Sequence, residues 1–458
     1  MMRKHILLAS LFITLRLLIP SPPSATASPL HKRNTDTRLE IFPQVHSWDH
    51  SPLAEILTRD QQRVESLRHR IVMGGNNKSQ TPPLLPTNTG SSSIPLTSGL
   101  SIGSGNYYVK LGIGSPAKYH AMLMDTGSSL SWMQCKPCVI YCHSQADPVF
   151  DPSASSTYSK LSCATPECSS LKAATLNDPA CEADSNACIY TASYGDASYS
   201  IGYLGKDVLN LSPAAGSGSG SQQRFTFGCG QDNQGLFGRA AGILGLARDK
   251  LSFLSQVASN GFSYCLPTAT PAASSSGGGY LSLGSSALSS LPYKFTPMLT
   301  DPKNPSLYFL DLTAITVAGK PLPVSPDSYR VPTILDSGTV ITRIPAAAYT
   351  ALQAAVVKAV SGKFAQAPAY SILETCFKGK LSEMAAAVPR VGLVFRGGAG
   401  LDLLPRNLLV EVPEDGITCL GFTKSPTIAI IANRQQQTVN VAYDVANSRI
   451  GFAPGGCH

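Results

Sequence analysis

The fold is decided by residues 121–128, which read AMLMDTGS, and by residues 332–339, which read PTILDSGT. In each stretch an apolar run typical of a buried strand leads to one Asp, Asp125 or Asp336, in a tight turn that also holds a Gly and a hydroxyl residue. One such turn is common by chance in a Gly-rich chain. Two copies, one in each half, indicate an internal duplication at the level of a lobe.

Each turn is followed downstream by two apolar residues and a small one, because residues 243–245 read ILG and residues 430–432 read IIA. The surrounding chain consists of short apolar runs separated by Gly and Pro, a texture typical of short strands. Strands are predicted at residues 107–113, 119–124, 225–228, 334–335, 427–431 and 438–443, and short helices at 251–258 and 346–360. The sequence therefore predicts an all-β fold of two lobes with a few short helices.

Length and charge limit the possible functions. The chain has 458 residues, which is more than one ordinary core of about 100–200 residues holds. Charged residues make up 14%, below the roughly 25% that is usual for soluble domains. The formal net charge is +8, but more than half of the excess lies before residue 92, and no run of five basic residues occurs. The composition therefore argues against a nucleic-acid partner.

Two segments at the start of the chain are expected to be removed. Residues 1–27 have a basic start, an apolar block and the small-residue pattern Ala-Thr-Ala, as a signal peptide does. Residues 28–91 are expected to be a pro-segment and linker, with a helix at 53–72 followed by a polar, Pro-rich stretch suited to proteolytic release. No later stretch offers about 20 consecutive apolar residues, so no membrane span is expected.

The remaining chain is expected to form an N-terminal lobe with a Cys-rich insert, residues 92–275, and a C-terminal lobe, residues 276–458. All twelve Cys lie in these lobes, and an even number in a secretory chain indicates up to six disulfides. Cys135 and Cys138 have a spacing that suits zinc, and His143 is near. No second pair completes a zinc site, so disulfides are expected and a metal is not.

Further motifs carry a family resemblance. They are CKPC at 135–138, YGDAS at 194–198, AGILGL at 241–246, YDV at 443–445 and RIGFAP at 449–454. With the paired Asp turns, they resemble the pepsin-like aspartic proteases, and within them the plant nepenthesin/nucellin-like branch, which includes chloroplast-nucleoid DNA-binding-type aspartyl proteases. The resemblance covers the chain from about residue 100 to its C-terminus. It implies a bilobal pepsin-like acid protease fold, in which two β-barrel-like lobes enclose a central cleft.

The resemblance implies that Asp125 and Asp336 are a catalytic pair at the floor of that cleft. Like charges held close together do not both ionise easily, so one pKa rises and the other falls, as is established for the aspartic-protease pair. The ionised member then takes a proton from a water that attacks the peptide carbonyl, while the protonated member donates to the carbonyl oxygen. The implied function is an aspartic endopeptidase acting on proteins or peptides at acidic pH, with no metal or other cofactor.

The resemblance also assigns supporting roles near the cleft. Tyr194 and Gly195 resemble the hairpin flap that closes over substrate, and Trp132 resembles the tryptophan that hydrogen-bonds the flap tyrosine. The residues that would orient the carboxylates or bridge the two turns are Thr126, Gly127, Ser128, Ser337, Gly338 and Thr339.

The chain departs from the family pattern at Ala432, where the family normally has Gly. That Gly packs against the backbone of the second Asp turn, and an added methyl in a tight site costs about 1–3 kcal/mol. If the position also requires a positive φ, Ala is less favourable than Gly. We therefore hypothesise that Ala432 perturbs Asp336 and lowers activity.

Two other functions fit parts of the sequence. The first is a catalytically weak or dead pepsin-like protein that acts as an inhibitor or binding module, as in the plant xylanase-inhibitor relatives, although these typically lack an intact Asp pair. The second is a plastid DNA-associated protease, for which the chain offers no basic patch. The N-terminus favours secretion to the extracellular space or the vacuole over the chloroplast, and the low charge of the mature chain favours a monomer.

Two secondary hypotheses concern processing. The pro-segment with its helix at 53–72 could block the cleft, because its basic side chains could pair with the Asp dyad until acid protonates the carboxylates; the alternative is a helix that only aids folding. Those basic residues are Arg59, Arg63, Arg68 and Arg70. Asn77 and Asn210 fit the N-glycosylation pattern, so both are candidate sugar sites.

Overall fold

Most of the chain after residue 52 is described by the structure, which is a computed structural model. The described residues are 53–73, 92–98, 104–211, 222–235, 237–257, 259–268, 278–455 and 457. All of them belong to one compact unit, Asp36–His458. The expected signal peptide, the linker and Asn77 lie outside the described residues. Within the described part of the chain, no helix is both long and apolar enough to cross a membrane.

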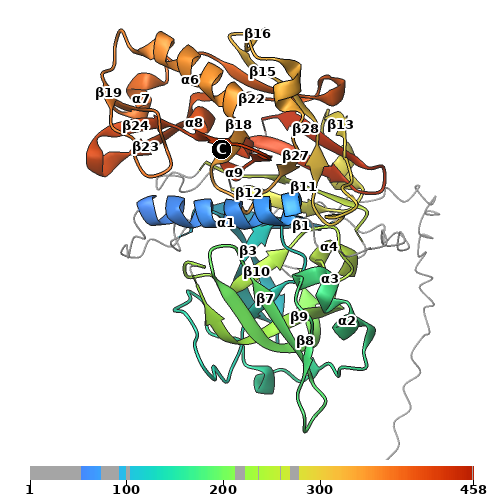
Figure 1. Cartoon of the computed structure of the whole chain (residues 1–458). Coiled ribbons are helices and arrows are strands. Elements are labelled where there is room, and N and C mark those ends of the chain that lie inside the picture. The colour runs from blue at the N-terminus through green and yellow to red at the C-terminus, as the bar shows by residue number, and fades with distance from the viewer. Residues whose placement is uncertain are drawn as a thin grey trace, which may run out of the picture. The chain divides into compact units, whose positions relative to one another are not determined.

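Strands dominate the described chain and form four sheets (Figure 1). The largest sheet contains strands of both lobes. Its order is β13 (Lys294–Pro297), β28 (Arg449–Pro454), β27 (Val439–Asp444), β11 (Gly261–Cys265), β12 (Gly279–Leu283), β1 (Ser92–Ser98), β2 (Tyr107–Ile113), β3 (Lys118–Asp125), β10 (Gly242–Gly245), β4 (Trp132–Gln134), β9 (Gln222–Gln234), β8 (Tyr199–Asn210), β7 (Cys188–Ser193) and β6 (Ala180–Cys181), with β5 (Ser159–Lys160) paired to β8.

Three smaller sheets belong to the C-terminal lobe. The first is ordered β14 (Phe309–Leu310), β17 (Thr333–Leu335), β26 (Ala429–Ile431), β18 (Thr342–Pro345) and β25 (Phe422–Ser425). The second is ordered β16 (Lys320–Pro321), β15 (Leu312–Val317), β21 (Val391–Phe395) and β22 (Gly400–Leu403). The third is ordered β19 (Gln366–Ala367), β20 (Cys376–Lys378), β24 (Ile417–Leu420) and β23 (Leu409–Val412). The predicted all-β, two-lobed fold is confirmed.

Helices are mostly short. They are α1 (Leu53–Met73), α2 (Pro166–Ser169), α3 (Leu171–Thr175), α4 (Phe253–Gln256), α5 (Ser286–Ser289), α6 (Ala346–Val360), α7 (Leu381–Met384), α8 (Pro405–Leu408) and α9 (Asn433–Gln436). Turns of 3-10 helix lie at Pro152–Ala154, Pro326–Tyr329, Arg396–Gly398 and Pro413–Asp415. The helices predicted at 53–72 and 346–360 are confirmed. The helix predicted at 251–258 is shorter, because Ser252 caps α4 by accepting the N–H of Ser255.

The internal duplication is visible in the strand pairing. Strand β10 lies parallel to β3, with Gly245 opposite Asp125. Strand β26 lies parallel to β17, with Ile431 opposite Leu335, the residue before the second Asp. In each lobe the downstream apolar motif therefore forms the strand beside the one that delivers the Asp.

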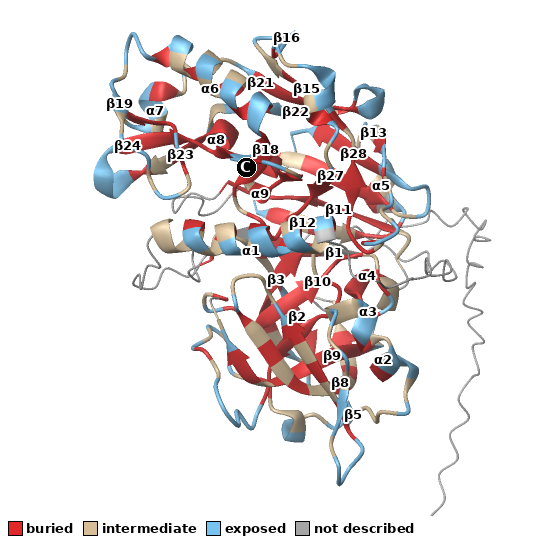
Figure 2. Cartoon of the chain, in the orientation of Figure 1, coloured by how far each residue is buried: buried red, intermediate tan, exposed pale blue. Residues whose placement is uncertain are grey.

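Buried aromatic rings fill the region between the lobes. Phe262 and Tyr443 stack with their centroids 4.4 Å apart, and Tyr308 meets Tyr443 edge to face at 4.5 Å. The hydroxyls of Tyr264 and Tyr443 lie 3.0 Å apart. Figure 2 shows that β11 and most of β27, the strands that carry Phe262, Tyr264 and Tyr443, are buried. Such dense aromatic packing gives the site a rigid support.

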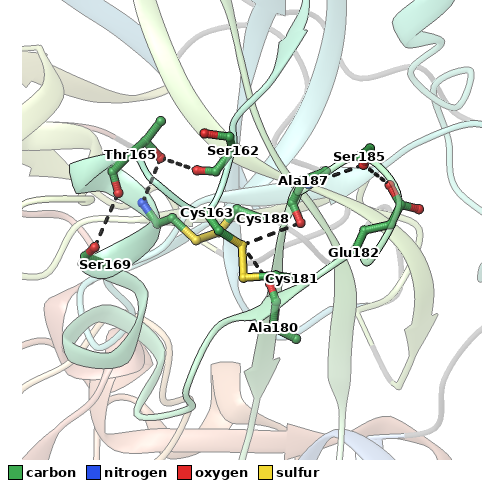
Figure 3. Close-up of a disulfide and its surroundings, with 11 residues drawn as sticks. Ser162, Cys163, Thr165, Ser169, Ala180, Cys181, Glu182, Ser185, Ala187 and Cys188 are labelled. Carbon is green, nitrogen blue, oxygen red and sulfur yellow. Dashed lines mark hydrogen bonds between the residues drawn. A yellow bond between two sulfur atoms is a disulfide. The ribbon is translucent and has the colours of Figure 1, made fainter.

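All twelve Cys form disulfides, as expected. The pairs are Cys135–Cys229, Cys138–Cys142, Cys163–Cys181, Cys168–Cys188, Cys265–Cys457 and Cys376–Cys419. Figure 3 shows two of them in the Cys-rich insert, where Cys163 and Cys181 lie beside Cys188. The CxxC pair is split between two different disulfides, so its thiolates are not available to a metal.

Candidate active site

The structure brings the two repeated Asp turns together. Asp125 ends strand β3 and Asp336 follows strand β17, and the two residues are 3% and 1% exposed. Both accept hydrogen bonds from the guanidinium of Arg63, a residue of α1. A buried pair of carboxylates from two lobes therefore faces one cation.

Each carboxylate is held by donors of its own turn. The N–H of Gly127 donates to Asp125 Oδ1 at 2.8 Å, and Ser128 Oγ donates to Asp125 Oδ2 at 2.5 Å. In the second lobe, the N–H of Gly338 donates to Asp336 Oδ1 at 3.2 Å, and Thr339 Oγ1 donates to Asp336 Oδ2 at 2.5 Å. The two turns thus orient their carboxylates through the same pair of contacts.

The glycines of the turns are required by the close approach of the opposite carboxylate. A Cβ at Gly127 would lie 3.0 Å from Asp336 Oδ1, and a Cβ at Gly338 would lie 2.4 Å from Asp125 Oδ1. Arg63 Nη2 would lie as near, 2.8 Å from a Cβ at Gly127 and 2.4 Å from a Cβ at Gly338, so a side chain at either position would crowd both the guanidinium and a carboxylate. The residues before these glycines, Thr126 and Ser337, connect the two turns through their hydroxyls and amides.

Helix α1 lies between the two lobes and covers the dyad (Figure 1). Arg63 Nη2 donates to Asp125 Oδ1 at 2.7 Å and to Asp336 Oδ2 at 3.1 Å, and Arg63 Nη1 donates to Asp125 Oδ2 at 3.1 Å. The guanidinium therefore fills the space between the two carboxylates. In the described part of the chain, Arg63 is the residue of α1 that is recorded in ion pairs with both Asp residues.

The remaining Arg residues of α1 have other partners. Arg59 pairs with Glu55 and Arg68 with Glu65, both within the helix. Arg70 donates to Asn304 and Ser306 of the C-terminal lobe. These partners were not predictable from the basic character of the helix alone.

The charges at the dyad shift its pKa values in opposite directions. Burial opposes ionisation of Asp125, but Arg63, Ser128 and the N–H of Gly127 together hold the pKa of Asp125 below its usual value. Burial raises the pKa of Asp336 above its usual value, and the nearby Asp125 charge adds to this while Arg63 opposes it. Burial also disfavours the charge of Arg63, yet the two carboxylates raise its pKa. In the pH range between the two shifted pKa values, one carboxyl of the pair is ionised and the other is protonated.

The expected flap residues lie beside the dyad and against α1. Trp132 Nε1 donates to the hydroxyl of Tyr194 at 2.7 Å, and Phe237 packs edge to face on Trp132 with a centroid distance of 4.9 Å. A Cβ at Gly195 would lie 1.9 Å from Cβ of Ser66 in α1, so the flap touches the helix closely. Burial raises the pKa of Tyr194, so its hydroxyl keeps its proton.

Position 432 does not require a positive φ, so that possible reason for a perturbation by Ala432 is wrong. Ala432 has φ −84° and ψ 171°, an extended conformation that any residue adopts. Its N–H donates to Thr342 Oγ1 at 2.9 Å, as the N–H of Gly245 donates to Ser131 Oγ at 3.0 Å in the first lobe. The methyl group therefore occupies a position without backbone strain.

Three residues of the site region escaped prediction from the sequence. Phe237 packs on both Trp132 and Tyr194, but an isolated Phe carries no motif. Asp60 and Arg343 form a buried ion pair beside the dyad. The only sequence signal for Asp60 is its position one helical turn before Arg63, which places both on one face of α1.

Comparisons with known proteins match almost the whole described chain. Family models described as Xylanase inhibitor N-terminal and Xylanase inhibitor C-terminal match residues 107–285 and 307–454. An aspartyl protease family protein of Arabidopsis thaliana is 40% identical over 444 residues, which cover 95% of this chain and 88% of that relative. The aspartic proteinase nepenthesin-2 of Nepenthes gracilis is 34% identical over 78% of each chain. The solved structure of basic 7S globulin from soybean matches with a TM-score of 0.61 at 20% identity, covering 80% of this chain and 97% of that one, which bears on the fold alone.

Proposed function

Because the chain belongs to the pepsin-like aspartic protease family of plants, we propose that it hydrolyses peptide bonds of proteins at acidic pH with Asp125 and Asp336 as its catalytic pair. The observation that carries this proposal is the pair itself. Two buried carboxylates from two repeated turns each keep their own amide and hydroxyl donors and face one cation. Relatives named aspartic proteases act on proteins, so the substrates are proteins.

The opposite pKa shifts of the pair suit general acid–base catalysis. In the open cleft, the ionised carboxylate takes a proton from a water whose oxygen attacks the scissile carbonyl carbon, and the protonated carboxyl donates to the carbonyl oxygen. Proton transfer to the amide nitrogen then lets the C–N bond break, which releases an acid and an amine. The protons belong to the pair as a unit, so neither carboxyl is assigned a fixed role.

The turn and flap residues would support this reaction by positioning groups and excluding water, and would not themselves transfer protons. Ser128 and Thr339 fix the outer carboxylate oxygens through their hydroxyls. Tyr194, held by Trp132, would close over a bound peptide and exclude bulk water. Because these contacts exist before substrate arrives, little reorganisation is needed on binding.

Helix α1 is proposed to keep the enzyme inactive until it is removed. Arg63 occupies the space that the water and the substrate carbonyl must enter, and it neutralises the charge that activates the water. Residues 28–91 would therefore act as an inhibitory pro-segment. Secretion is part of the same proposal, to the extracellular space or the vacuole, with the chloroplast as the less favoured destination.

The mature enzyme would work as a monomer without metal or cofactor, and Asn210 is its candidate sugar site. Asn210 is the half-buried last residue of strand β8, at the edge of the described range that ends at Leu211. Treatment with a glycosidase should increase its gel mobility, and an Asn210→Gln variant should not respond.

The test is cleavage of a denatured protein from pH 2 to 8 after removal of residues 28–91, with and without pepstatin. We expect activity in acid that is abolished by pepstatin, by Asp125→Asn and by Asp336→Asn. Asp178→Asn is the matched control, because Asp178 is largely exposed and pairs only with Lys172 in the described structure. Folded, processed protein without any cleavage would overturn the proposal and favour an inhibitor-like binding role.

A further inference from the structure

A second charged contact between α1 and the cleft lies one helical turn from Arg63. Asp60 Oδ2 and Arg343 Nη1 are 2.7 Å apart, and both side chains are only 1% exposed. Arg343 Nη2 also donates to Gln61 Oε1 at 3.1 Å. In the part of the chain that the structure describes, Asp60 is the only carboxylate recorded in an ion pair with Arg343.

Backbone donors of the C-terminal lobe complete the contact. The N–H of Val340 donates to Asp60 Oδ1 at 2.5 Å, and the N–H of Ile341 donates to Asp60 Oδ2 at 3.2 Å. Three donors from one short segment thus converge on a single carboxylate. Convergent donors of this kind, with a buried guanidinium among them, are typical of a built carboxylate site.

All three donors belong to the lobe that carries Asp336, whereas the carboxylate belongs to α1. When α1 leaves, the amides of Val340 and Ile341 lose Asp60 as their acceptor, and Arg343 loses Asp60 and Gln61 but keeps its hydrogen bond to the carbonyl oxygen of Ile341. An arginine keeps its charge in acid, so the cleft of the mature enzyme would present on strand β18 a cation that has lost its carboxylate partner. A guanidinium flanked by two backbone N–H donors favours a carboxylate that enters the cleft, because each of these donors can make a charge-assisted hydrogen bond to it.

We propose that Arg343, with the amides of Val340 and Ile341, forms a substrate subsite that binds an acidic side chain of the peptide, and that Asp60 occupies this subsite in the precursor. The inference rests on the proposed protease function and on the loss of α1. It adds a specificity: substrates with Glu or Asp at one position near the scissile bond are preferred.

The position of the subsite along the peptide follows from the helix. Asp60 and Arg63 are three residues apart, which is about 4.5 Å along a helix axis. An extended peptide advances about 3.3 Å per residue, so the acidic residue should lie within about two residues of the scissile bond. The cavity of about 80 Å³ beside α1 is lined by Asp60 and Val340 as well as Asp125, so the carboxylate that occupies the subsite and one of its three donors face the same cavity as the dyad.

The preference should depend on pH in a defined direction. A free Glu side chain ionises near pH 4.3, so only substrate above that pH carries the charge that Arg343 recognises. The preference for Glu over Gln should therefore be large at about pH 5 and small at about pH 3. A subsite that recognises shape alone would show no such change.

The primary experiment needs no variant of the site. The full chain is folded as the precursor, cut at a specific protease site introduced between residues 74 and 91, and freed of α1. Fluorogenic peptides with amidated C-termini carry Glu or Gln at each of the positions flanking the scissile bond, and products are mapped by mass spectrometry. We expect kcat/KM to be about tenfold or more higher for Glu than for Gln at one position at about pH 5.

Variants then connect the preference to Arg343. Arg343→Met alone leaves Asp60 as a buried unpaired charge and can prevent folding, so it is combined with Asp60→Asn, which departs with α1. The processed double variant should cleave Glu and Gln peptides equally and still cleave denatured protein. Arg330→Met is the matched control, because Arg330 is 80% exposed, and it should keep the preference.

A binding assay at about pH 7 tests the subsite without turnover. A peptide of residues 53–73 should bind the processed chain about tenfold or more tightly than its Asp60→Asn form, and this difference should vanish in the Arg343 variant. Cleavage of denatured protein with equal rates for Glu and Gln peptides at every position would overturn the subsite but leave the protease function. Absence of all cleavage would overturn the protease function, and equal affinity of the two peptides would then overturn the carboxylate site as well.

Discussion

Thr126 and Ser337 are 211 positions apart in the sequence, yet each receives the amide hydrogen of the other on its hydroxyl oxygen. The N–H of Thr126 donates to Ser337 Oγ at 3.1 Å, and the N–H of Ser337 donates to Thr126 Oγ1 at 2.9 Å. Both side chains are fully buried. The spacing of Asp125 and Asp336 therefore depends on a contact that neither lobe can make alone.

Replacing Thr126 by Val should weaken this contact. Val has nearly the same shape but no hydroxyl, so the buried N–H of Ser337 loses its acceptor at a cost of about 1–3 kcal/mol. We expect a lower Tm and at least a tenfold lower kcat in the processed enzyme. Thr126→Ser keeps the hydroxyl and should retain most activity, and Thr126→Val with unchanged kcat would show that the contact does not set the spacing.

Removing the charge of Arg63 should activate the precursor. In Arg63→Gln the dyad is no longer neutralised, so the uncut chain should cleave a peptide substrate at least tenfold faster than the uncut wild type. Arg68→Gln is the matched control, because Arg68 pairs within α1 and does not reach the dyad. Equal activity of the two uncut variants would mean that α1 blocks the cleft by its bulk alone.

Acid should release α1 through Asp125. A carboxyl with a lowered pKa contributes stability that is present above its unfolded pKa and is lost as the pH falls through the lowered value. Asp336, whose pKa is raised, acts in the opposite direction, and its contribution is lost as the pH rises through that raised value. The contribution of Asp125 is therefore complete above pH 3.8, the ordinary value of Asp, and the helix should loosen progressively as the pH falls below 3.8 toward the lowered pKa of Asp125.

Limited proteolysis of α1 as a function of pH measures this release. The wild-type precursor should become sensitive below pH 3.8, whereas Arg63→Gln should be equally sensitive above and below that pH. A wild-type helix that stays protected down to pH 2 would contradict the electrostatic release.

The two small residues of the repeated motif should respond differently to exchange. A Cβ at Gly245 would lie 2.4 Å from the carbonyl oxygen of Ser129, so Gly245→Ala should lower stability by about 1–3 kcal/mol and reduce activity. Ala432 has an ordinary φ, so Ala432→Gly should leave kcat within about twofold and lower stability by about 0.5–1 kcal/mol. Thermal unfolding and kcat of both variants test the contrast, and a faster Ala432→Gly enzyme would restore the overpacking hypothesis.

Much of the fold could be predicted from the sequence because its signals are local. The apolar runs before Asp125 and Asp336 form β3 and β17, as expected. The helix predicted at 53–72 is α1, and the repeated ILG and IIA motifs form the neighbouring parallel strands. The spacing of apolar residues and the residue types of a turn are properties of a few adjacent positions, so they can be recognised in a single sequence.

The partners of individual side chains could not be predicted, because they depend on contacts between distant segments. Four Arg residues of the helix were candidates for the dyad, and the choice of Arg63 follows from how α1 is rotated in the cleft. The pairing of Asp60 with Arg343 spans 283 positions and has no repeat or motif. Which Cys pairs with which could not be predicted for the same reason.

Strand β1 has a consequence for how the chain can be trimmed. It begins 19 residues after α1 ends, and it is held between β12 and β2 with Ile94 and Leu96 buried. A protease that frees α1 must therefore cut between Met73 and Ser92, since a cut beyond residue 92 would remove hydrogen-bonded sheet instead of a tether. After the cut, β1 stays hydrogen-bonded to β12 and β2 in the central sheet. Exopeptidases that trim the new N-terminus should therefore stop near the start of β1 and leave a uniform N-terminus.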